Sequence, residues 1–227
     1  MKLFPQPKAA ITALVALASA SHALGLLTLA QDTCGAALTG FELMSGVCLQ
    51  LVAEQFPQLP QPFTTRHAQY VLLELSSNES EAHAVGLLEA TVGRAVELAL
   101  CDDAVVATSL AQSRGLWNLR EHIPLAQAAA GKNIKHDISL PISRIADFIA
   151  QTDAALADAF PQAQVICFGH LGDGNLHYNV APRDGASHDA FLGNQLAINR
   201  IVNDKVTAMD GSISAEHGIG AQSHTRS

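Results

Sequence analysis

The sequence predicts an α+β fold in which helices flank a largely antiparallel sheet. Short runs rich in leucine and β-branched residues alternate with longer segments of helical periodicity. Two of the short runs are joined by a glycine-rich turn, and no internal repeat is present. This alternation is typical of helices layered on a sheet.

Composition limits the kinds of partner. The chain has 227 residues, enough for one large domain or two small ones, and 48% of them are apolar while 15% are charged. The formal net charge is −8, and Lys and Arg form no cluster. A nucleic acid or an anionic membrane surface is therefore excluded as a partner. Small molecules or proteins remain, and the high apolar fraction suggests that part of the surface meets one.

The four cysteines indicate reduced thiols. Cys34, Cys48, Cys101 and Cys167 are far apart and form no C-x-x-C pair, which argues against a zinc knuckle and a disulfide framework. Reduced thiols lead to the expectation of a cytoplasmic location. No transmembrane segment is expected, because no run of 18 uninterrupted apolar residues is present.

The N-terminal segment can be interpreted in two ways. Lys2, Lys8 and an apolar run over 9–20 superficially resemble a signal peptide, although Pro5 and Pro7 interrupt its start. The apolar residues after Lys8 also follow helical spacing. We therefore interpret 8–31 as an amphipathic helix of the domain, with secretion as the alternative.

The middle of the chain alternates strands and helices. Residues 38–51 begin as a strand and turn helical at Glu42-Leu43-Met44, and three prolines then make a loop over 57–62. The later segments are, in order, a buried strand at 70–75, a helix at 79–99, a short strand at 104–108, a helix around Leu116 to Ile123, an extended stretch at 131–140 and a helix from Pro141 to about Phe160.

A β-hairpin is predicted near the C-terminal end. Strands at 164–169 and 175–180 flank Gly172-Asp173-Gly174, a turn that can supply positive φ angles. A helix over about 186–209 and a short stretch at 212–214 follow.

The hairpin carries side chains that can bind a metal ion. If His170 and His177 face each other across a tight turn, a Cβ separation of about 5 Å lets both imidazoles reach one ion at about 2 Å. The carboxylate of Glu216 completes a His₂Glu set, and three protein ligands leave positions open, as in catalytic zinc sites. Alternatively, each histidine is an ordinary polar strand residue, and Asp173 is ordinary turn chemistry.

Four further residues are candidates for binding or catalysis. Asn179 shares a strand face with His177 and can contact a ligand held by the metal, while His217 is free to act as a base. Arg120 and Lys135 together suit a small organic anion, although each could equally be a solvated surface charge. The single tryptophan, Trp117, is expected in the core.

Four motifs in order resemble one known family. The stretches 116–121, 135–141, 169–180 and 214–220 (LWNLRE, KHDISLP, GHLGDGNLHYNV and SAEHGIG) are similar to the C-terminal, substrate-binding half of the FAD-linked oxidases. LFPQP and GFELM nearer the N-terminus also match. This family includes D-2-hydroxyglutarate and D-lactate dehydrogenases of the vanillyl-alcohol-oxidase type. The resemblance implies a ferredoxin-like, largely antiparallel sheet and FAD as a cofactor.

The resemblance also implies roles for single residues. A divalent metal, commonly zinc, is held by His170, His177 and Glu216. Arg120 and Lys135 bind the carboxylate of the substrate, Asn179 contacts the substrate, and His217 accepts a proton. The chain departs from some members at Pro124, where they have a hydroxyl residue, and this leaves the identity of the substrate open.

The implied reaction is the oxidation of a D-2-hydroxy acid to the 2-oxo acid. The metal binds the hydroxyl and carboxylate oxygens and lowers the pKa of the hydroxyl, His217 takes its proton, and hydride passes from C2 to the flavin.

The resemblance further implies how the chain is organised. Residues 1–220 are expected to be a truncated substrate-binding domain, with a polar tail at 221–227 and with the FAD-binding domain of the family as a missing partner in cis or in trans. We expect such a chain alone to bind metal and hydroxy acid without oxidising it. The alternatives are a non-catalytic metal- or anion-binding module and an inactive truncated product.

Overall fold

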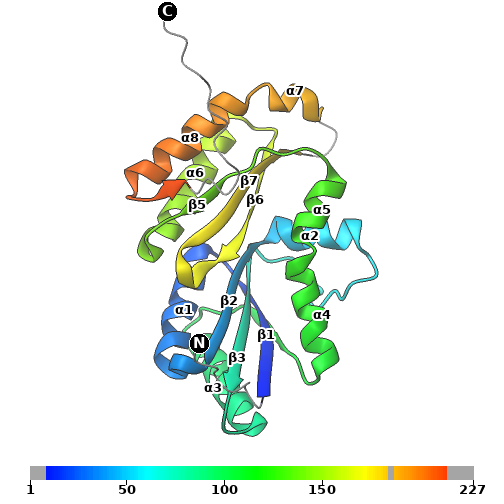
Figure 1. The fold of residues 1–227 in the computed structure, drawn as a ribbon, viewed down its shortest axis with the longest axis vertical. Coiled ribbons are helices and arrows are strands. Elements are labelled where there is room, and N and C mark those ends of the chain that lie inside the picture. Colours follow the sequence, from blue (N-terminus) through cyan, green and yellow to red (C-terminus); the bar gives the residue numbers. More distant parts are fainter. Residues whose placement is uncertain (1–8, 184–186, 214–227) are drawn as a thin grey trace, which may run out of the picture.

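The fold is built around one antiparallel sheet. The structure, a computed structural model, describes residues 9–183 and 187–213. Within these ranges, eight strands pair in the order β4-β1-β3-β2-β6-β7-β5-β8, and every pair is antiparallel (Figure 1). The strands are β1 (Ala9–Leu17), β2 (Leu38–Ser45), β3 (Gln69–Ser77), β4 (Asp103–Val106), β5 (Asp137–Ser139), β6 (Ala163–His170), β7 (Asn175–Pro182) and β8 (Ser212–Ile213). The predicted α+β class is confirmed.

Helices cover both faces of the sheet. One core joins it to α1, α3, α6 and α8, and a second core joins the opposite face to α2, α4 and α5. Figure 1 shows α4 and α5 on one side of the strands, with α1, α6 and α8 on the other. The helices are α1 (Ala20–Cys34), α2 (Gly46–Gln55), α3 (Glu81–Glu97), α4 (Leu110–Glu121), α5 (Ile123–Ala130), α6 (Ile145–Ala159), α7 (His188–Leu192) and α8 (Gln195–Ala208). We call the side covered by α2, α4 and α5 the α4 face.

Local sequence signals explain several boundaries. Successive residues of β3 alternate between the two cores, with Leu72 on the α4 face and Leu73 on the other, as the period of a strand requires. The hydroxyls of Ser19, Ser80 and Ser109 accept a backbone N–H in the first turns of α1, α3 and α4, respectively. Serine at this position satisfies a donor that the helix itself leaves without a partner.

The helix predicted over 8–31 is wrong in its first half. Residues 9–17 form β1, and the helix begins only after Ser19. β1 lies between β3 and β4 and is covered by helices on both faces, so nearly all its side chains are buried. A strand buried on both faces loses its polar alternation, and a short apolar run then cannot be distinguished from a helix by periodicity.

Two other boundaries differ from the sequence prediction. β2 continues through Glu42 to Ser45, and α2 begins at Gly46, so Glu42 belongs to the sheet and not to a helix. The segment predicted as one helix over about 186–209 contains two helices, α7 and α8, separated at Gly193–Asn194. The remaining predicted strands and helices, including the hairpin, are present within a few residues of their expected positions.

Two further sequence expectations can be compared with the structure. All four cysteines are buried and free of disulfides. No helix within the described ranges combines the length and the apolar character that crossing a membrane requires.

Candidate functional site

The register of the hairpin places His170 and His177 on the α4 face, but not opposite each other. His177 of β7 is paired with Phe168 of β6, whereas His170 lies beyond the last β6–β7 pair and is opposite Glu42 of β2. The two strands are joined by the 3₁₀ turn Leu171–Asp173 and Gly174, at φ 74°, and in this register His170 lies two positions beyond Phe168, the residue opposite His177. The expected cross-strand separation of about 5 Å is therefore wrong, because diagonal neighbours have their Cβ atoms about 7 Å apart.

Each of these two histidines is paired with a carboxylate through the same ring nitrogen. His170 Nδ1 is paired with Glu42 Oε1, and His177 Nδ1 with Asp137 Oδ1. Asp137 lies opposite His177 on β5, just as Glu42 lies opposite His170 on β2. The Nε2 atoms are then the ring nitrogens that can bind a ligand.

Arg120 joins this group from α4. Its Nε donates a hydrogen bond to Glu42 Oε2 at 2.8 Å, and its Cζ lies 4.8 Å from the centre of the Phe168 ring. Phe168 in turn packs against the imidazole of His177, with ring centres 4.7 Å apart. The arginine, the aromatic ring and both histidines therefore form one connected cluster.

A cleft of about 440 Å³ adjoins this cluster. It lies between α5 and the strands, and its lining includes Lys135, Phe168, His177 and Asn179. Pro124, where the sequence departs from some members of the family it resembles, lines it as well. The cleft thus brings Lys135 and Asn179 to the same place as His177, whereas Arg120 and His170 are not among its lining residues.

Asn179 is less free than the sequence suggested. It is 4% exposed, its Nδ2 donates to Gln127 Oε1 at 2.8 Å, and its Oδ1 accepts from the backbone N–H of His136 at 3.2 Å. Two of its four hydrogen-bonding positions therefore already have a partner within the protein. Asn179 links α5 to the segment that carries Lys135 and Asp137, in addition to lining the cleft.

His136 fixes the segment between Lys135 and Asp137. Its ring nitrogens lie 2.8 Å from the carbonyl oxygen of Tyr178 and 2.9 Å from Oδ1 of Asn199 on α8. Burial lowers the pKa of the His136 imidazole, although both contacts oppose the change. The buried ring therefore anchors the exposed Lys135 and the partly buried Asp137, which both border the cleft.

Three residues next to the candidate site residues were not predicted from the sequence. Glu42 and Asp137 each pair with a candidate histidine, and Gln127 supports Asn179. A signal for Glu42 was present, since a lone carboxylate within the apolar run Phe41–Met44 requires a buried partner. Trp117 packs partly in the core as expected, with its Nε1 donating to Glu74 Oε2 at 2.7 Å.

The other two candidates cannot be placed. Glu216 and His217 lie outside the described residues. Within 9–183 and 187–213, no group of three His, Cys, Asp or Glu side chains is positioned to hold a metal ion. The described part of the chain therefore supplies two candidate ligands, His170 and His177.

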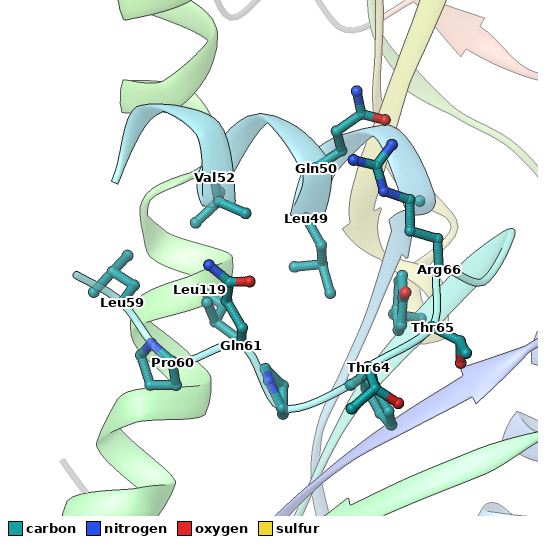
Figure 2. Close-up of a pocket in the computed structure, with 15 residues that line it drawn as sticks. Leu49, Gln50, Val52, Leu59, Pro60, Gln61, Thr64, Thr65, Arg66 and Leu119 are labelled. Atoms are coloured by element: carbon teal, nitrogen blue, oxygen red, sulfur yellow. The ribbon is translucent and has the colours of Figure 1, made fainter. Parts of the chain in front are cut away.

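A second cavity on the α4 face is smaller and separate. It has a volume of about 180 Å³ and lies between α2 and the loop that precedes β3. Figure 2 shows Leu49 and Val52 of α2 directed towards the segment that carries Leu59 and Pro60. Its lining mixes apolar side chains with polar ones such as Gln50, Thr64 and Arg66, and it includes none of the candidate site residues that the structure describes.

Comparison with known proteins identifies the family. A family model described as "FAD linked oxidases, C-terminal domain" matches residues 6–225. D-2-hydroxyglutarate dehydrogenase of Stutzerimonas stutzeri is 36% identical over 183 residues, which are 81% of this chain and 39% of the relative. The mitochondrial D-2-hydroxyglutarate dehydrogenase of Rattus norvegicus is 33% identical over 221 residues, 95% of this chain and 38% of the relative. The chain thus spans about two fifths of the length of these relatives.

Solved structures support the same fold. A p-cresol methylhydroxylase with bound substrate superposes with a TM-score of 0.58 at 11% identity, covering 90% of this chain and 44% of that protein. An alkyldihydroxyacetonephosphate synthase gives a TM-score of 0.56 at 9% identity, covering 93% of this chain and 41% of that protein. With the family match over nearly the whole chain, these findings show that the protein belongs to the family of FAD linked oxidases, C-terminal domain.

Proposed function

We propose that this chain is the substrate-binding part of an FAD-dependent oxidoreductase that oxidises a D-2-hydroxy acid to the 2-oxo acid. The observation that carries the proposal is the cluster of Arg120, Phe168, His177 and His170 beside the cleft that Lys135 and Asn179 line. The relatives named D-2-hydroxyglutarate dehydrogenase support the substrate class. In this proposal, an FAD-binding domain is the partner in cis or in trans.

The two cations suit an acidic substrate. Arg120 is held by Glu42 and Phe168, so its guanidinium presents its remaining donors without further ordering. Lys135 adds a point charge as part of the lining of the cleft. A carboxylate bound by a guanidinium gains charge-assisted hydrogen bonds, and a second cation favours a substrate with one or two carboxylates.

The donor set fits a divalent metal. Metal-binding imidazoles are commonly oriented by a carboxylate on their other nitrogen, and both His170 and His177 have this arrangement. In the proposal, these two residues and Glu216 hold the ion, zinc being the family's usual metal, and a mixed nitrogen and oxygen set also accepts manganese or iron. When bound, such an ion acts as a Lewis acid that lowers the pKa of the substrate hydroxyl.

The chain's own residues then bind, orient and deprotonate the substrate. Arg120 and Lys135 fix its carboxylate, Asn179 contacts it from the wall of the cleft, and His217 takes the hydroxyl proton. The FAD, when bound, accepts the hydride from C2. A cytoplasmic location remains a prediction, since several relatives are named as mitochondrial.

Elemental analysis of the purified 227-residue chain tests the metal site. We expect about one zinc per chain in the wild type, and loss of that zinc in His177→Ala, because one of three protein ligands is removed. His83→Ala is the matched control: His83 lies on α3, on the other side of the sheet, and its side chain is 41% exposed against 42% for His177. Equal zinc content in the two variants would contradict the assignment.

A further inference from the structure

Glu42 touches two candidate site residues at once. Its side chain is 3% exposed, and each of its oxygens has a charged or polar partner: Oε2 accepts from Arg120 Nε, and Oε1 is paired with His170 Nδ1. A buried carboxylate is tolerated only when such partners compensate for its lost hydration. The position of Glu42 is therefore coupled to the positions of Arg120 and His170.

The contact with Arg120 orders the guanidinium. The side chain is 14% exposed and is held through Nε by Glu42 and through its flat face by Phe168. Within the described ranges, no residue accepts a hydrogen bond from its two terminal NH₂ groups. These groups are the donors that remain for a carboxylate of a bound acid.

The contact with His170 places a carboxylate oxygen of Glu42 next to Nδ1 of the ring, which favours a proton on that nitrogen. The His170 side chain is 62% exposed, and Glu42 is its only polar partner among the residues described. Donation to a carboxylate requires the proton on Nδ1, which leaves a lone pair on Nε2. Without Glu42, an imidazole this exposed is free to rotate and to exchange tautomers.

We propose that Glu42 is a positioning residue shared by the two halves of the site, one that orders Arg120 for an anion and presents Nε2 of His170 to a metal. Asp137 performs only the second task, for His177. The inference rests on the proposed function for the ligands involved, but the state of the His170 ring can be measured without either ligand.

The first test is the tautomer of His170 in the metal-free chain. Long-range ¹H–¹⁵N NMR, at a pH where the ring is neutral and with a His170→Gln variant for assignment, is expected to show the Nδ1–H form in the wild type. In Glu42→Gln, the amide oxygen can stay with Arg120 while its NH₂ group faces His170, so we expect a shift to Nε2–H. Nε2–H already in the wild type, or no change in the variant, would overturn the proposal.

The second test is zinc affinity, measured by competition with a chromophoric chelator. Loss of a carboxylate that orients a ligating histidine typically weakens metal binding about 10- to 100-fold, and we expect this for Glu42→Gln. Glu74→Gln is the matched control, because Glu74 is also a carboxylate that contacts α4, through Trp117, and among the described residues none of its hydrogen bonds is with a candidate site residue. Similar zinc affinities in the two variants would overturn the proposal.

The third test compares Glu42, which contacts both Arg120 and His170, with Asp137, which is paired with His177. Calorimetric titration of the zinc-loaded chain with D-2-hydroxyglutarate is expected to show weaker binding in Glu42→Gln than in Asp137→Asn at matched zinc occupancy, because only Glu42 also orders Arg120. Equal affinities would contradict the shared role. A wild type that binds neither zinc nor D-2-hydroxyglutarate contradicts the proposed function, and the tautomer measurement then still decides the role of Glu42. Should Glu42→Gln not fold, the wild-type tautomer decides alone.

Discussion

Two carboxylates on neighbouring strands of the same sheet face have very different surroundings. Glu74 of β3 accepts from the indole N–H of Trp117 and lies near threonine hydroxyls, all of them neutral. Glu42 of β2 is bound by the guanidinium of Arg120 and the imidazole of His170. Trp117 and Arg120 are three residues apart on α4, so this one helix supplies a hydrogen-bond donor to each carboxylate.

The difference distinguishes a carboxylate with a structural role, Glu74, from one that contacts candidate site residues, Glu42. The donors around Glu74 are neutral, and they join α4 to β1 and β3. Around Glu42, the partners are themselves candidate ligand-binding groups, and they continue through Phe168 to His177 and the cleft. Changes at Glu42 and its partners should therefore alter both stability and ligand binding, whereas changes around Glu74 should alter stability alone.

The largest expected effect follows from removing the cation beside Glu42. Arg120→Met leaves a carboxylate that is 3% exposed with only an imidazole as partner, and we expect a loss of about 3 kcal/mol in the free energy of unfolding. Urea denaturation measures it. Arg94→Met, which breaks an exposed helical ion pair with Glu97, is the control and should cost less than about 0.5 kcal/mol. Equal costs would show that Glu42 does not depend on Arg120.

A smaller effect is expected at the neutral carboxylate. Trp117→Phe removes the hydrogen bond to Glu74, and we expect a loss of about 1 kcal/mol, because Glu74 is only partly buried and keeps its hydroxyl neighbours. The same denaturation experiment measures it. Zinc affinity should be unchanged in this variant. A drop in zinc affinity as large as that of Glu42→Gln would contradict a difference in role between Glu42 and Glu74.

The smallest expected effect is a pH dependence near the cleft. Burial lowers the pKa of His136 in the folded state, so the unfolded chain takes up this proton first as the pH falls. The contribution of His136 to stability is therefore fully present above its unfolded pKa of about 6.5 and is lost as the pH falls through the folded pKa. Denaturation between pH 7.5 and 5 should show a shallower decline in His136→Asn than in the wild type. A parallel decline would contradict a buried, neutral His136.

Much of the fold was predictable because local signals determine it. The run Tyr70–Leu75, the glycine turn before Asn175 and Pro141 ahead of a helix each mark an element that the structure contains. β1 was not predictable from periodicity, because β3, β4 and the helices surround it on every side. Its burial depends on partners that are distant in the sequence.

The candidate site was predictable in its residue types but not in its connections. His177, Asn179 and Lys135 line one cleft. Glu42 and His170 are 128 positions apart and meet only because β2 and β6 are neighbours, and their pairing depends on the register between those strands. The register between β6 and β7 likewise places Phe168, and not His170, opposite His177.

The most direct test of the account is a zinc anomalous difference map from crystals of the 227-residue chain grown with zinc and D-2-hydroxyglutarate. The account predicts one peak at about 2.1 Å from Nε2 of both His170 and His177, with Glu42 and Asp137 still on the Nδ1 atoms and a ligand carboxylate at Arg120. A peak bound through Nδ1 of His170, or no peak shared by the two histidines, would contradict it.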